Sequence, residues 1–133
     1  MIEEGVQPKQ TVCIVDDNDD IRDIYSTKFK REGFAVVTAR DGEEGLQVIR
    51  TERPDVIVLD IQMPVLDGVG VLQALKADPD LEKIPVVVLS NIDSEEMFQT
   101  VGDLGAAKYY LVKALTEPQK VVDVTLEALA SRE

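Results

Sequence analysis

Asp60 directly follows an apolar run, Val56-Ile57-Val58-Leu59, in this sequence. The run is short, rich in β-branched residues and bounded by Pro54 and Pro64, which is typical of a fully buried parallel strand. A carboxylate at the carboxyl end of such a strand lies where open α/β sheets bind their ligands. A carboxylate there can bind a cation or act as a nucleophile, so Asp60 is the first candidate for chemistry.

Polar side chains also follow three other apolar runs. Asp16 and Asp17 come after the first run of the chain, Ser90 after the fourth and Lys113 after the fifth. Three neighbouring carboxylates repel one another, and a hard divalent cation such as Mg²⁺ relieves that repulsion. The Lys113 ammonium could pair with Asp60 and then with a phosphoryl oxygen, and the Ser90 hydroxyl could donate to another oxygen. Each residue alone is simply a polar residue at a strand end, but the set indicates a phosphoryl-accepting aspartate.

Alternating strands and helices are needed to position these side chains. The pattern predicts strands over 11–15, 34–38, 55–59, 85–89 and 107–112. It predicts helices over about 19–31, 41–51, 68–77, 94–104 and 116–130. Asp19 or Asp20 should cap the first helix, Asp93 or Ser94 the fourth, and Thr116 should start the last. Five βα units predict an α/β, flavodoxin-like fold: a five-stranded parallel sheet in the order 2-1-3-4-5, with helices on both faces.

Length and composition exclude several kinds of protein. The 133 residues suffice for one domain, which we expect over 11–133 after a flexible N-terminal tail, 1–10. The net charge of −12 is repelled by nucleic acid and by anionic membranes, so no direct contact with either is expected. The single cysteine, Cys13, lies in an apolar strand and excludes a disulfide scaffold. No apolar run approaches the ~20 residues that span a bilayer, and the N-terminus lacks a signal-peptide pattern, so a cytoplasmic location is expected.

Histidine is absent from the sequence. Its absence excludes Ser-His-Asp and Cys-His catalysis, zinc sites that contain histidine and an internal phosphohistidine. If phosphoryl groups come from a histidine, that histidine belongs to another protein.

The ordered set of motifs resembles a response-regulator receiver domain of two-component signalling. Beside Asp60, Ser90 and Lys113, it includes the acidic pair, the turn Met63-Pro64-x-x-Asp67-Gly68 and the dipeptide Gly105-Ala106. The spacings are 30 residues from Asp60 to Ser90 and 23 from Ser90 to Lys113. The resemblance covers about residues 10–131. These residues leave no room for an output domain, so we expect either a stand-alone receiver or a fragment of a longer regulator.

The resemblance implies a role for each acidic residue. Asp60 would be the phosphoacceptor, Asp17 the direct Mg²⁺ ligand and Asp16 a ligand through water. The backbone carbonyl of Gln62 would complete the protein ligands.

The resemblance also implies how the phosphoryl group would be bound and sensed. Lys113 and Ser90 would bind it, and an aromatic residue on the fifth strand would turn inward as the hydroxyl moves. Counting back from Lys113 gives Tyr110 as this aromatic residue, whereas counting forward from the Gly-Ala dipeptide gives Tyr109. Neighbours on a strand face opposite ways, so only one can serve, and we choose Tyr110.

Two residues depart from the family pattern. Ala114 follows the lysine where the family usually has a proline, often with a cis peptide bond; a trans bond is expected here. Asn91 follows the hydroxyl residue where the family prefers a small side chain. Both are expected to affect the site: Ala114 through the direction of the Lys113 side chain, and Asn91 through access to the phosphoryl group.

Partners are expected on the basis of the resemblance. A sensor histidine kinase or a histidine phosphotransfer protein would supply the phosphoryl group, and an unknown output protein would bind the face of the fourth helix, fifth strand and fifth helix. Phe98 is a candidate exposed aromatic residue on that face, because Met97, Val101 and Leu104 form the inward stripe. The last helix is more apolar than one buried stripe requires, which suggests a further interaction face. Homodimerisation on phosphorylation also stays open.

Three functions remain to be separated. The first is a phosphorylation-controlled switch with weak autophosphatase activity, which is not a metabolic enzyme. The second is a hydrolase of the aspartyl-phosphate type, although such enzymes usually carry a second aspartate where this chain has Gln62, and have a cap domain for which there is no room. The third is an interaction module of the same fold that is not phosphorylated.

Overall fold

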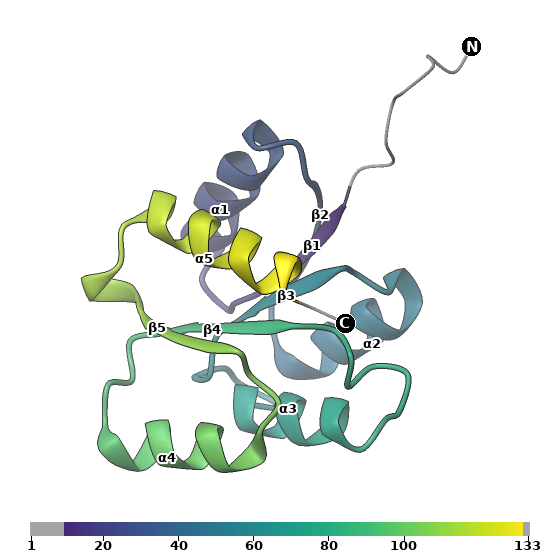
Figure 1. Ribbon diagram of the computed structural model, residues 1–133, viewed down its shortest axis with the longest axis vertical. Helices are drawn as coiled ribbons and strands as arrows, with labels where there is room; N and C mark the ends of the chain where they lie inside the picture. The colour runs from purple at the N-terminus through teal and green to yellow at the C-terminus, as the bar shows by residue number, and fades with distance from the viewer. Residues whose placement is uncertain (1–9, 132–133) are drawn as a thin grey trace.

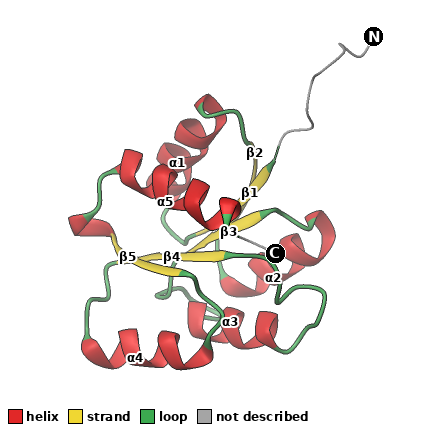
Figure 2. Ribbon diagram, viewed as in Figure 1, coloured by secondary structure: helices red, strands yellow, loops and turns green. Residues whose placement is uncertain are grey.

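The computed structural model describes residues 10–131 (Figure 2). The predicted tail therefore lies almost entirely outside the described residues. The strands are β1 (Thr11–Val15), β2 (Ala35–Ala39), β3 (Val56–Leu59), β4 (Val86–Ser90) and β5 (Tyr109–Val112). The helices are α1 (Asp19–Arg31), α2 (Gly42–Glu52), α3 (Gly68–Lys76), α4 (Glu95–Leu104), the 3₁₀ helix η1 (Lys113–Leu115) and α5 (Pro118–Ala130).

The five strands form one parallel sheet in the order β2-β1-β3-β4-β5, as predicted. Helices α1 and α5 cover one face, and α2, α3 and α4 cover the other (Figure 1). In the register between neighbours, Val15 of β1 pairs with Leu59 of β3. The residues that follow these two strands therefore emerge side by side at the carboxyl edge of the sheet.

Alternating side chains of the strands form a core on each face of the sheet. Val12 and Ile14 pack with α1 and α5, whereas Cys13 and Val15 pack with the helices of the other face. Burial raises the pKa of the Cys13 thiol to about 12, so the thiol is neutral and serves as packing. Among residues 10–131, no helix is both long and apolar enough to cross a bilayer.

The helix starts differ from the prediction at two places. Asn18, rather than Asp19 or Asp20, caps α1: its side-chain oxygen accepts the Ile21 N–H at 3.0 Å. The two aspartates lie in the first turn, where their negative charge interacts favourably with the helix dipole. Ser94 caps α4 as predicted.

The last helix begins at Pro118, with Glu117 as its N-cap, and not at Thr116. The Thr116 hydroxyl instead donates to the Val112 carbonyl at 2.8 Å, which closes η1. The sequence pattern did not predict this 3₁₀ turn.

Strand boundaries shift by one or two residues. Phe34 does not begin β2, because its N–H donates to the Phe29 carbonyl and its ring packs edge-on against Phe29 at 5.3 Å. It therefore completes the end of α1.

The expectation of an additional apolar face on α5 is wrong. Four of its five large apolar residues are buried, and only Leu126 is exposed. The helix packs against α1 and also against β3, β4 and β5, so it needs a wider buried face than a single stripe.

Candidate functional site

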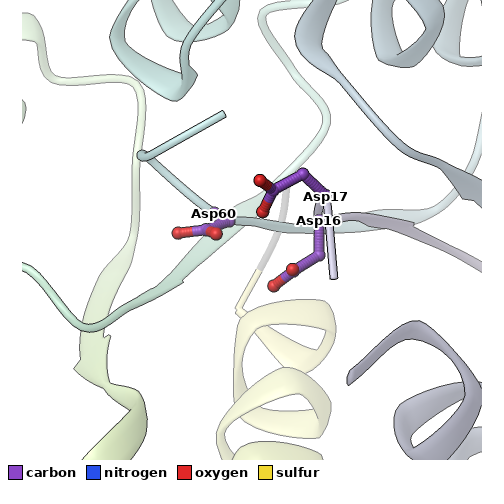
Figure 3. Close-up of side chains that lie close together, drawn as sticks. All are labelled: Asp16, Asp17 and Asp60. Carbon is purple, nitrogen blue, oxygen red and sulfur yellow. The ribbon is translucent and has the colours of Figure 1, made fainter. Parts of the chain in front are cut away.

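The carboxyl ends of β1 and β3 bring three aspartates together (Figure 3). The Asp60 N–H donates to the Val15 carbonyl at 2.9 Å, which extends the pairing of the two strands by one residue. Asp16, Asp17 and Asp60 each offer an oxygen, and these atoms all lie within 4.8 Å of one another. Asp16 and Asp60 are buried, whereas Asp17 is exposed. An all-oxygen set with this spacing fits a hard divalent cation.

Lys113 joins two of these aspartates. Its Nζ lies 2.7 Å from Oδ2 of Asp16 and 3.2 Å from Oδ2 of Asp60. The pair with Asp60 was expected, but the shorter pair with Asp16 was not. Because Lys113 begins η1 directly after β5, the position of its ammonium depends on that short turn.

Ser90 ends β4 and is fully buried. Its Oγ accepts the N–H of Ile92 at 3.3 Å, so the hydroxyl stabilises the first turn of the β4–α4 loop. The Asp60 carboxylate similarly accepts the N–H of Gln62 at 3.3 Å. No hydrogen bond among the described residues joins Ser90 to Asp60.

A cavity of about 310 Å³ opens at this edge of the sheet. It is large enough for a phosphoryl group with a cation and water. Its lining residues come from four loops and from the start of α1: Asp17, Asn18, Ile21, Asp60, Gln62, Asn91 and Lys113.

The turn after Asp60 holds that residue in place. The Gly68 N–H donates to the Ile61 carbonyl at 2.8 Å, and Asp67 caps α3 by accepting the Gly70 N–H at 2.9 Å. A Cβ on Gly68 would lie 2.4 Å from the Asp60 carbonyl oxygen, so only glycine lets α3 approach so closely. The predicted Met-Pro-x-x-Asp-Gly turn thus has a structural reason for its last two residues.

Arg22 was missed by sequence reasoning. Its Nη1 donates to the backbone carbonyl of Asp16 at 2.7 Å, and its Nη2 pairs with Asp19 one turn earlier on α1. The i, i+3 spacing of Asp19 and Arg22 could have indicated the ion pair, but not the contact with the β1–α1 loop.

The two tyrosines of β5 face opposite sides of the sheet, as expected. The Tyr109 hydroxyl reaches Glu127 of α5, while Tyr110 packs with the core on the α4 side. The Tyr110 hydroxyl donates to the Ile92 carbonyl at 2.7 Å, and its ring lies edge-on to Phe98 at 4.8 Å. Tyr110 therefore contacts the loop that follows Ser90, whereas Tyr109 contacts α5; the choice of Tyr110 as the switch residue stays a prediction. Phe98 lies at the surface, 36% exposed.

The two departures from the family pattern contact each other. The Ala114 N–H donates to Oδ1 of Asn91 at 3.1 Å. No peptide bond among the described residues is cis, so the Lys113–Ala114 bond is trans as expected.

A family model described as the response regulator receiver domain matches residues 12–125. The chain belongs to this family. The receiver domain is 42% identical over 104 residues to a probable transcriptional regulator, ycf27, of Guillardia theta, with 78% of this chain and 40% of that protein covered. It is 43% identical over 114 residues to the transcriptional regulatory protein PrrA of Mycobacterium tuberculosis, with 85% of this chain and 47% of that protein covered.

Solved structures give the same result. The chemotaxis response regulator CheY4 of Vibrio cholerae superposes with a TM-score of 0.83 at 30% identity, covering 91% of this chain and 99% of that one. The receiver domain of a Francisella response regulator gives 0.82 at 30% identity, covering 92% and 98%. This chain thus matches whole receiver domains but spans less than half the length of the curated relatives.

Burial opposes the charge on Asp60 in the receiver domain. Burial raises the pKa of Asp60, Lys113 lowers it again and the nearby Asp16 raises it, and the net result lies above the ordinary value. Burial alone would lower the pKa of Lys113, but the hydrogen bond to Asp16 and the charge of Asp60 outweigh it and raise that pKa. The Lys113 ammonium therefore stays charged, whereas keeping the Asp60 carboxylate ionised lowers the stability of the fold.

Asp60→Asn should therefore change the stability of the fold when a chelator has removed divalent cations. A carboxyl group with a raised pKa in the folded state destabilises the fold as pH rises above its unfolded value of 3.8. At pH 7 we expect Asp60→Asn to unfold at a higher urea concentration than wild type. The difference should shrink as the pH is lowered through the raised pKa of Asp60, because protonation removes the buried charge. Asp103→Asn, which removes an exposed carboxylate on α4, is the control and should show no such gain.

Proposed function

We propose that this receiver domain is a phosphorylation-controlled signalling switch in which Asp60 accepts the phosphoryl group. The donor would be a phosphohistidine on a sensor histidine kinase or a histidine phosphotransfer protein. The observation that carries the proposal is the buried Asp60 carboxylate in an open cavity, with the Lys113 ammonium at 3.2 Å and two more carboxylates beside it. A buried carboxylate retained at a cost to stability is typical of a functional group.

Asp16, Asp17, Asp60 and the backbone carbonyl of Gln62 would hold Mg²⁺. The three carboxylates supply oxygen ligands close to one another, and the cavity leaves room for water and phosphoryl oxygens. The bound cation would neutralise charge on the phosphoryl oxygens during transfer. Arg22 keeps the Asp16 backbone in place for this arrangement.

The chain's own groups suit each part of the transfer. An Asp60 oxygen forms a bond to phosphorus as the bond from phosphorus to the donor's histidine nitrogen breaks, and the electron pair leaves with that nitrogen. Lys113 shifts part of its pairing from Asp60 to a phosphoryl oxygen, and the Ser90 hydroxyl donates to another. Water later hydrolyses the acyl phosphate, which gives the weak autophosphatase activity expected of a switch rather than metabolic turnover.

The signal would leave through the face formed by α4, β5 and α5. When the Ser90 hydroxyl turns to the phosphoryl group, the Ile92 N–H loses its acceptor. The Ile92 carbonyl also accepts a hydrogen bond from the Tyr110 hydroxyl. The Tyr110 ring can therefore follow a movement of Ile92 and change its contact with Phe98. The resulting surface would bind an output protein or a second copy of the domain. The charge of −12 argues against direct contact of this chain with nucleic acid, and the cytoplasm is its expected location.

Intact mass spectrometry tests phosphoryl transfer to Asp60. After incubation with Mg²⁺ and acetyl phosphate, we expect an adduct of about +80 Da, one phosphoryl group. The adduct should disappear in Asp60→Asn and in a chelator, and it should persist in Asp103→Asn. Lack of an adduct in wild type with any donor would favour a phosphorylation-independent interaction module. Steady release of phosphate from simple esters would favour a hydrolase.

Ring resonances test the relay. The chain has three tyrosines and three phenylalanines, so labelled rings give few signals. On phosphorylation we expect the Tyr110 and Phe98 ring signals to shift, and Tyr109 to serve as an internal control on the opposite face. A larger shift of Tyr109 than of Tyr110 would contradict the choice of Tyr110 as the switch residue.

A further inference from the structure

The residue after Ser90 and the residue after Lys113 are joined by a hydrogen bond. Asn91 lines the cavity, and its Oδ1 accepts the Ala114 N–H at 3.1 Å. In the β4–β5 register, Ser90 pairs with Val112. The side chain of Asn91 thus joins the two chain segments just beyond the point where the strands separate.

The Ala114 N–H lacks an acceptor within its own turn. It belongs to η1, and the first N–H groups of a helix have no partner inside that helix. Asn91 provides the missing acceptor from another loop, much as an N-cap residue does from the same chain segment. Proline at position 114 would have no N–H to donate, so this contact requires a residue other than proline there.

The β4–α4 loop is itself held at two other points. The Ile92 N–H donates to Ser90 Oγ, and the Ile92 carbonyl accepts the Tyr110 hydroxyl. Because these contacts fix the loop on the sheet, Asn91 offers η1 an anchored acceptor. Lys113 is the first residue of η1, so a displacement of that turn moves its ammonium relative to Asp16 and Asp60.

We propose that Asn91 is a positioning residue that holds η1, and with it the Lys113 ammonium, over Asp16 and Asp60. Asn91 and Ala114 then act as one pair. The effect on Lys113 exists in the unphosphorylated protein. The effect on phosphoryl transfer rests on the proposed function, because Lys113 would bind the incoming phosphoryl group.

NMR of the ¹⁵N-labelled full chain tests the positioning directly. In Asn91→Ala we expect faster hydrogen exchange of the Ala114 amide, by about two- to ten-fold, the range that one net hydrogen bond provides. The Lys113 ammonium signal should also shift or broaden. Asn91→Asp keeps an acceptor oxygen and should keep the Ala114 amide protected. Unchanged exchange and an unchanged Lys113 signal in Asn91→Ala would overturn the proposal.

Phosphoryl uptake from acetyl phosphate provides a second test through a double-mutant cycle. Asn91→Ala and Ala114→Pro should each slow uptake by about two- to ten-fold. The double variant should be no slower than the slower single variant, because both remove the same contact. Ala114→Gly keeps the N–H and should react more like wild type than Ala114→Pro does.

The two tests fail in different ways. Effects that multiply in the double variant would mean that the two residues act independently, which overturns the pair. If wild type takes up no phosphoryl group, the proposed function fails, and the amide and ammonium signals still decide whether Asn91 positions Lys113.

Discussion

The convergence of Asp16, Asp17 and Asp60 at one edge of the sheet is the constraint on which the rest of the site depends. Parallel strands β1 and β3 are neighbours in register, so the residues after them must lie together. Two of the three carboxylates are buried. Within the described residues, the basic side chain that pairs with both buried carboxylates is Lys113. Its single charge cannot balance three carboxylates, which is why the site is suited to a divalent cation and to a group that brings new contacts.

Contacts around the three aspartates hold them together although their charges repel one another. Gly68 lets α3 close on the Asp60 backbone, and Arg22 fixes the Asp16 carbonyl. Asn91 holds the turn that carries Lys113, in the role that we propose for it. Ser90 and Tyr110 both contact Ile92, so the same loop that would sense a phosphoryl group also leads to the surface near Phe98. A buried ion pair contributes little to net stability, and its retention is better explained by function.

The sequence pattern sufficed for the sheet and for most of the acidic site. Apolar runs of β-branched residues separated by helical periods predict five βα units, for which right-handed crossovers allow only a few strand orders. Polar residues that directly follow these strands are then expected at the ligand-binding edge of the sheet. For that reason Asp16, Asp17, Asp60, Ser90 and Lys113 could be placed before the structure was known. Family resemblance was needed to choose their roles.

Contacts between loops could not be predicted in this way. The pair of Lys113 with Asp16, the bond of Arg22 to the Asp16 carbonyl and the bond of Asn91 to Ala114 depend on side-chain directions that only tertiary packing determines. The additional apolar residues of α5 were wrongly interpreted as an interaction face for a related reason. This helix is buried against α1 and against three strands, and a helical wheel does not show how many neighbours a helix has.

The effect of Mg²⁺ on the stability of Lys113→Met tests most directly whether a cation must balance the buried carboxylates. In a chelator, loss of the ammonium should leave two buried carboxylates without their cation and lower the free energy of unfolding by about 2 kcal/mol. Saturating Mg²⁺ should then stabilise Lys113→Met more than it stabilises wild type, because a bound cation takes over the missing charge. Lys108→Met, at an exposed lysine, should respond to Mg²⁺ as wild type does. Equal stabilisation of wild type and Lys113→Met by Mg²⁺, with no loss of stability in the chelator, would contradict the account.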